Sequence, residues 1–216
     1  MQIADLIEQA ILSNKVELWD RVQQEAISYR NDHPENPEAY YILGYIYFEM
    51  PRRTDKQSKL AADAFTLCLA KKPDHQLALY HISIIRFLEG HYPAALATLN
   101  KIHYDYFFAI AQPWRILKIE ELKLACRLYL GEEVPLAKFE AFAKLCVTLL
   151  EDRAEVPSLL EISRCLNDML DRKLLSKINE APQKIIANLI TSLGQQSIFS
   201  KKTGPFYDYL RRDGKL

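Results

Sequence analysis

Histidine is the side chain of this sequence whose spacing most directly tests for metal chemistry. The histidines occupy positions 33, 75, 81, 91 and 103. They form no HExxH motif and no paired spacing typical of a metal site. His75 and His81 would point in different directions from one helix, because six residues are not a whole number of turns. His33, His75 and His91 fall at predicted helix junctions, where a histidine often serves as a cap. We therefore expect no metal site.

The cysteines and carboxylates also lack a catalytic arrangement. Cysteines occur at Cys68, Cys126, Cys146 and Cys165, with no CxxC pair. Each lies among apolar residues in a helical pattern, where a free thiol behaves as a small hydrophobic side chain, and this usage fits a reducing compartment. Adjacent acids such as Glu120 and Glu121 diverge by about 100° on a helix, so they make a poor acid–base pair. The scattered glycines form no phosphate-binding loop. We expect a protein that is not an enzyme and needs no cofactor.

The charge balance argues against two further classes of protein. Lys and Arg total 28, as do Asp and Glu, so the formal net charge is zero. A neutral chain is not typical of nucleic-acid or membrane-surface binding, and we expect neither. Asp5 and Glu8 interrupt the first apolar run, unlike the core of a signal peptide. No uncharged apolar run reaches the ~18 residues of a membrane span. These features predict a cytoplasmic protein.

Prolines and glycines divide the chain into helices. From Pro51 onward, prolines follow at intervals of 20 to 25 residues. This spacing leaves room for one helix of about four to five turns and a short connection. Gly90 and Gly131 fall where two of these helices should stop. Residues 50–59 are polar and predict an exposed loop. No strand alternation occurs, so we expect an all-α fold of about ten or eleven helices.

Two segments, 37–50 and 77–102, begin with helices that are apolar on nearly every side. Such a helix must be buried on two opposite faces. Each of these helices, and a third near residue 125, has a small residue in its middle, followed by an alanine in the next helix. The pairs are Gly44 and Ala61, Ser83 and Ala95, and Ala125 and Ala137. Small residues at facing positions would let two antiparallel helices approach closely.

In this register the chain resembles the tetratricopeptide repeat. The first repeat carries the family's aromatic, Leu-Gly and aromatic residues, then its alanine, aromatic, small and proline residues: Tyr40, Leu43, Gly44, Tyr47, Ala61, Phe65, Cys68 and Pro73. The second repeat matches through Ile82, Ser83, Gly90, Tyr92, Ala95, Leu99 and Ile102. The resemblance covers residues 37–103 and continues in degenerate form to about residue 150.

The resemblance implies a fold and a division of the chain. Hairpins of this family stack into a right-handed α-α superhelix, because each leaves an apolar face that only a neighbour can cover. We therefore expect a single helical-repeat domain over residues 1–216. Its parts would be an N-terminal hairpin (1–36), the repeats (37–150) and C-terminal capping helices (151–216).

One face of the repeats is the predicted binding site. Residues three before, one after and four after each central small residue share a helix face. These groove residues are Tyr41, Tyr45, Phe48, Tyr80, Ile84, Phe87, Leu122, Cys126 and Tyr129. The resemblance implies that they line a concave groove that holds a peptide or helix of a partner protein. None is Lys, Arg or Asn, so we expect no clamp for a C-terminal carboxylate.

Three occupants would cover such an apolar face. The first is a partner protein, which would make the chain an adaptor or a chaperone-like scaffold. The second is the chain's own C-terminal segment, which is rich in Ile198, Phe199, Phe206, Tyr207, Tyr209 and Leu210. The third is another copy of the chain in a homo-oligomer.

Overall fold

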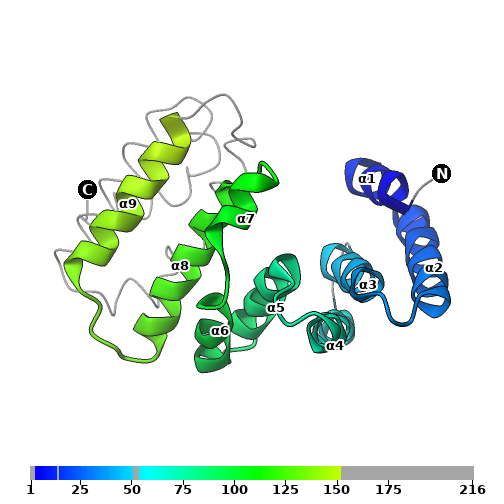
Figure 1. Cartoon of the computed structure of the whole chain (residues 1–216), viewed down its shortest axis with the longest axis horizontal. Helices are drawn as coiled ribbons and strands as arrows, with labels where there is room; N and C mark the ends of the chain where they lie inside the picture. The colour runs from blue at the N-terminus through cyan, green and yellow to red at the C-terminus, as the bar shows by residue number, and fades with distance from the viewer. Residues whose placement is uncertain (1–2, 14, 51–53, 152–216) are drawn as a thin grey trace. The chain divides into compact units, whose positions relative to one another are not determined.

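The computed structural model describes residues 3–13, 15–50 and 54–151 (Figure 1). Throughout these residues the chain forms helices joined by turns, with no strand, which confirms the all-α prediction for this part. Two compact units divide the chain, Met1–Ile102 and His103–Leu216, and each is described by itself. The helices predicted beyond residue 151 lie outside the described residues. None of the described helices is both long enough and apolar enough to cross a bilayer.

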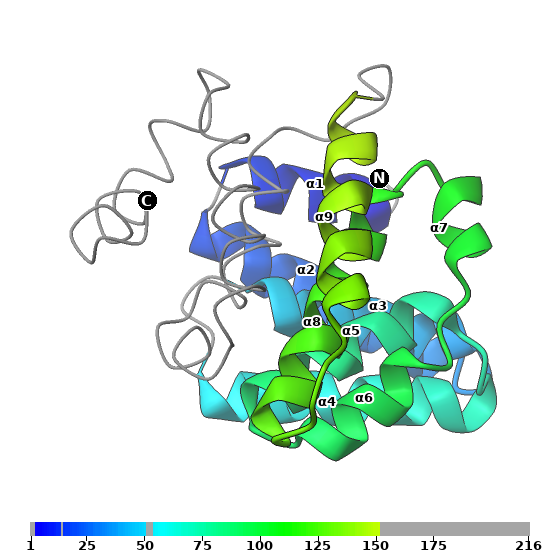
Figure 2. The same ribbon diagram turned by 90° about the vertical axis from the view of Figure 1, so that its left-hand side faces the viewer.

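The first unit consists of three helix pairs in chain order. The helices are α1 (Ile3–Ser13), α2 (Val16–Asp32), α3 (Pro37–Glu49), α4 (Asp55–Lys71), α5 (Gln76–Leu88) and α6 (Tyr92–Leu99). Each pair is in contact, and the pairs are joined by contacts of α2 with α3, α4 with α5, and α3 with α5. We call α1, α3 and α5 the first helices and α2, α4 and α6 the second helices. In Figure 2, α4 and α6 lie below α3 and α5.

Side chains cap the N-termini of the central helices. The Asn36 side chain accepts a hydrogen bond from the backbone N–H of Glu38 at 3.0 Å, and Pro37 opens α3. At α4, Thr54 and Gln57 form a reciprocal capping box. This box starts α4 at Asp55, so the prediction of a loop over residues 50–59 is wrong in its second half. A polar segment can begin a helix when its side chains satisfy the first backbone N–H groups.

Three helices end in the same hydrogen-bonded motif. Gly90 after α5 and Gly131 after α8 (Trp114–Tyr129) have φ of 78° and 73°, as a left-handed cap requires. The N–H of the next residue bonds to the carbonyl five positions back in each case. Ala111 ends α7 (Tyr104–Ala109) with the same hydrogen bonds and a φ of 53°, although its Cβ makes this conformation costly. The glycine stops predicted from the sequence are confirmed.

Helices α3 and α4 approach each other closely at Gly44. A Cβ placed on Gly44 would lie 2.7 Å from Cε1 of Phe65, which is fully buried. Ser83 and Ala95 are also fully buried, as the register predicts. Ala137 is instead exposed, so it does not make the close contact that we expected with Ala125. On the same helix, α9 (Leu136–Glu151), the buried residues are Phe139 and Phe142 instead of the alanine.

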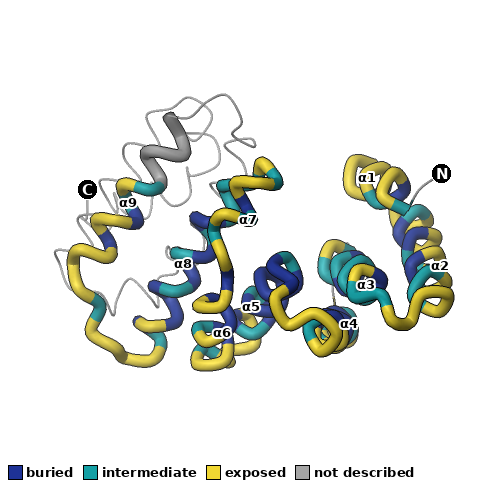
Figure 3. The backbone as a smooth tube through the Cα atoms, in the orientation of Figure 1, coloured by how far each residue is buried: buried dark blue, intermediate teal, exposed yellow. Residues whose placement is uncertain are grey.

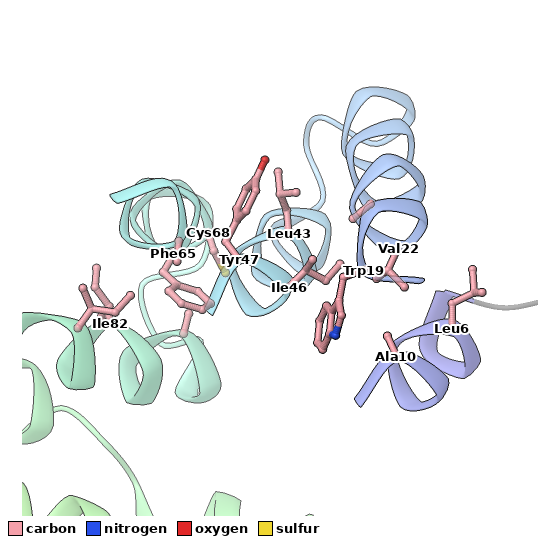
Figure 4. Close-up of a cluster of buried hydrophobic side chains, with 14 residues drawn as sticks. Leu6, Ala10, Trp19, Val22, Leu43, Ile46, Tyr47, Phe65, Cys68 and Ile82 are labelled. Carbon is pink, nitrogen blue, oxygen red and sulfur yellow. The ribbon is translucent and has the colours of Figure 1, made fainter. Parts of the chain in front are cut away.

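The core of the first unit runs through all three pairs. It includes Leu6 and Ala10 of α1, Trp19 and Val22 of α2, and Ile46 of α3 (Figure 4). Helix α5 is buried around most of its circumference (Figure 3), as its apolar sequence predicts. The groove residues of α3 are only partly buried and pack against this core.

The second unit contains three described helices. These are α7 (Tyr104–Ala109), α8 (Trp114–Tyr129) and α9 (Leu136–Glu151). Helix α8 contacts both of the others and buries nine of its residues. Phe107 of α7 and Phe139 of α9 are almost completely buried.

Ala111 offers a direct test of the helix-end geometry. We expect Ala111→Gly to raise the free energy of unfolding by about 1 kcal/mol, because glycine adopts the positive φ without strain. Gly90→Ala should lower it by a similar amount, since no atom lies within 4 Å of the added Cβ and only the backbone is strained. Urea unfolding followed by circular dichroism measures both changes. A loss of stability in Ala111→Gly would contradict the assigned cap.

Gly44 tests the approach of α3 to α4. We expect Gly44→Ala to destabilise the chain by about 1–3 kcal/mol, the usual cost of overpacking a core. Combining it with Phe65→Leu should cost less than the sum of the two single changes, because the smaller side chain makes room for the new methyl group. Additive losses in a double-mutant cycle would show that the two residues do not meet.

Candidate functional site

Three aromatic residues of the predicted groove lie together on α3, and none of them is fully buried or fully exposed. We call Tyr41, Tyr45 and Phe48 the aromatic strip. All three are half-buried, and the Tyr41 and Tyr45 rings are stacked with centroids 6.1 Å apart. Their rings lie 5.2 to 5.8 Å from the ring of His81 on α5. The strip therefore packs sideways onto the neighbouring first helix while part of each ring stays accessible.

His81 is the organising residue of this site, and the sequence did not single it out. The imidazole is 1 % exposed and stacks on Phe65 of α4, with centroids 5.4 Å apart and planes at 18°. Its Nδ1 lies 2.7 Å from the carbonyl oxygen of Leu77. A carbonyl only accepts, so Nδ1 carries the hydrogen. The position of His81 in the register could have indicated this role. It lies two residues before Ser83, on the side of α5 that meets the preceding pair.

The groove residues of α5 are mostly core. Tyr80 and Phe87 are 4 % and 7 % exposed, and Ile84 is half-buried. The Phe87 ring lies edge-on to Tyr92 of α6, with centroids 5.5 Å apart. On this helix Ile84 is the one groove residue with substantial exposed surface.

The remaining groove residues lie in the second unit. Leu122 and Cys126 of α8 are fully buried, and Tyr129 is half-buried. The six groove residues of α3 and α5 belong to the first unit. That all nine form one continuous strip stays a prediction.

His75 joins the N-terminal ends of α3 and α5. Its Nδ1 accepts a hydrogen bond from the N–H of Ala78 at 3.1 Å and so caps α5, as its place at a helix junction predicts. Nε2 therefore carries the hydrogen and donates to a carboxylate oxygen of Glu38 at 2.8 Å. With Asn36 capping α3 in the same way, the N-termini of both helices are satisfied by the chain's own side chains.

A polar cluster links α7 to α8 in the second unit. The Tyr104 hydroxyl donates to Glu120, and Lys123 contacts both, at 2.6 Å from the hydroxyl oxygen and 3.0 Å from the carboxylate. Burial, together with the hydrogen bond to Glu120, raises the pKa of Tyr104. A catalytic base would need a lowered value, so this cluster fits a structural role.

The buried thiols are likewise unsuited to nucleophilic chemistry. Burial, with the nearby charge of Glu38 as a smaller cause, raises the pKa of Cys68 to about 12. Burial alone raises that of Cys126 to about 12. Reactive cysteines instead have a lowered pKa. Among the residues that the structure describes, no group of three His, Cys, Asp or Glu side chains is arranged to hold a metal ion.

Comparisons with known proteins add no relative. No family model, no curated protein and no solved structure matches this chain.

The two thiols give a test of the described core. In a variant with Cys146 and Cys165 replaced by alanine, we expect no reaction of Cys68 and Cys126 with Ellman's reagent at pH 8 until urea unfolds the chain. In the unfolded chain these thiols ionise at pH ~8.5, whereas in the folded chain their pKa is about 12. Their contribution to the free energy of unfolding is therefore fully present below pH ~8.5 and is lost as the pH rises toward 12. Rapid labelling of the folded protein at pH 8 would contradict the burial of both residues.

Proposed function

We propose that the chain is a non-enzymatic scaffold that binds an apolar peptide or helix of a partner protein. The observation that carries this proposal is the aromatic strip, whose rings His81 holds in place while they remain partly accessible. Tyrosine and phenylalanine give large contact areas at low cost in side-chain entropy, which favours them at binding surfaces. On the next first helix, α5, the half-buried groove residue is Ile84.

We also propose that the helix pairs form a solenoid of the tetratricopeptide type. Each pair in the first unit contacts the pair that follows it in the chain, and α3 contacts α5, as stacked repeats require. The Gly44–Phe65 contact agrees with the family's use of a small residue in the first helix. Repeats of this kind bind partners along their first helices, which is where the aromatic strip lies.

The proposed partner is a protein. With a protein as its ligand, the chain would act as a cytoplasmic adaptor or a chaperone-like factor. Neither nucleic acid nor a membrane suits a surface built on apolar rings in a neutral chain. Nothing in the proposed site calls for a cofactor.

A second candidate is a self-associating structural protein whose groove its own C-terminal segment fills. The burial of Tyr80, Phe87, Leu122 and Cys126 favours this option, because much of the predicted groove is already covered. The segment itself lies outside the described residues.

Substitutions on half-buried groove residues test the proposed site. We expect Tyr45→Ala with Ile84→Ala to abolish capture of partners by the full chain, because both side chains contribute accessible apolar surface. Phe87 is not used, since emptying a buried aromatic position costs about 3–5 kcal/mol and would unfold the site. Capture is measured by quantitative mass spectrometry of proteins retained from a native lysate.

The matched control is Leu67→Ala on α4, which removes an exposed side chain from a second helix. This variant should retain the same partners as the unchanged chain. Equal capture by all three proteins, with unchanged circular dichroism, would contradict the proposed site.

Truncation after Leu193 separates the two candidates. If a partner occupies the groove, the shortened chain should bind a hydrophobic dye no more than the full chain does. A large gain in dye fluorescence with helix content retained would instead favour the self-filled groove.

A further inference from the structure

Charge is unevenly distributed between the two sets of helices in the first unit. The first helices carry four acidic side chains and one basic side chain, a formal net charge of −3. The second helices carry six acidic and five basic side chains. The acids of the first helices are Asp5, Glu8, Glu38 and Glu49, and all four are exposed. The excess negative charge therefore lies on the helices that carry the proposed binding site, in a chain that is neutral as a whole.

The single base on these helices is turned toward the second helix of its own pair. Arg86 of α5 is half-buried and donates a hydrogen bond to the Thr98 hydroxyl of α6. Thr98 is 4 % exposed and in turn donates to the carbonyl of Ala94 at 2.8 Å. This anchoring directs the guanidinium charge toward α6.

On α3 two acids lie close in direction to Tyr45, the middle residue of the aromatic strip. A helix turns by about 100° per residue, so Glu38 lies within about 20° of Tyr45, seven residues later. Glu49 lies within about 40° of Tyr45 by the same rule. The helix therefore presents aromatic rings along its length and a carboxylate at either end. At this end the Glu38 carboxylate also accepts a hydrogen bond from Nε2 of His75 at 2.8 Å.

We propose that the partner segment recognised by this face is amphipathic and basic, with apolar side chains flanked by Lys or Arg. Its apolar side chains contact the aromatic strip and Ile84, and its flanking cations lie near Glu38 and Glu49. Opposite charges at the rim of an interface fix orientation, speed association and disfavour acidic competitors. The proposal rests on the proposed function, because it assigns the partner class of that same site.

Two synthetic peptides test the assignment with the full-length chain. Both are amphipathic helices of about 18 residues with the same apolar positions, and their polar positions are Lys in one and Glu in the other. Fluorescence anisotropy measures binding at about 0.05 M and about 0.5 M NaCl. We expect the Lys peptide to bind about tenfold more tightly at low salt. The difference should shrink at high salt, where surface charges are screened.

Matched charge variants locate the effect. Neutralising the first-helix acids (Asp5→Asn, Glu8→Gln, Glu38→Gln and Glu49→Gln) should remove most of the preference for the Lys peptide. Neutralising four exposed acids of the second helices (Asp20→Asn, Glu25→Gln, Asp55→Asn and Asp63→Asn) changes the net charge equally and should leave the preference intact.

Other results would overturn the assignment in distinguishable ways. If both peptides bind equally and the double variant Tyr45→Ala with Ile84→Ala weakens their binding, the proposed function stands and the basic partner is refuted. Binding of neither peptide would refute both. If the chain is a dimer in sedimentation velocity and the same double variant is a monomer, a second copy of the chain occupies this face instead.

Discussion

The contact between the Phe65 ring and the backbone of Gly44 is the constraint on which the rest of the first unit depends. No side chain separates α3 from α4 at this point, so the ring fills the space that a Cβ would occupy. His81 of α5 stacks on the same ring, which fixes where the next pair begins to pack. Tyr41, Tyr45 and Phe48 then pack around His81. The position of the aromatic strip thus depends on Gly44, because a Cβ at this residue would exclude the Phe65 ring.

Several polar side chains in the described part of the chain connect one helix to another. His75 caps α5 and reaches Glu38 of α3, while Tyr104 joins α7 to α8. The pKa of Tyr104 and of the buried thiols is raised, which keeps these groups protonated and unreactive at neutral pH. The proposed role of this surface is recognition of a partner through shape, apolar area and charge at the rim.

The sequence predicted the local structure well because proline and glycine act locally. Gly90 and Gly131 end helices where expected, and Gly44 makes the predicted close approach. The start of α4 was missed, since the reciprocal bonds of Thr54 and Gln57 turn apparent loop residues into a helix N-terminus. Ala111 was missed as a helix end because alanine rarely adopts a positive φ.

The candidate site was predicted only in part, since its residues meet through tertiary packing. Helical periodicity placed Tyr41, Tyr45 and Phe48 on one face, but their common partner His81 lies on another helix. The same apolar residue types serve a core and a groove, so the sequence could not show that Tyr80 and Phe87 are buried.

Intermolecular nuclear Overhauser effects between the full-length chain and the Lys-flanked peptide test the central claim most directly. Contacts from apolar peptide protons to the ring protons of Tyr41 and Tyr45 are the predicted result, with the methyl groups of Ile84 as the next partners. Contacts confined to side chains of α4 and α6, such as Leu67, would contradict binding on the first helices.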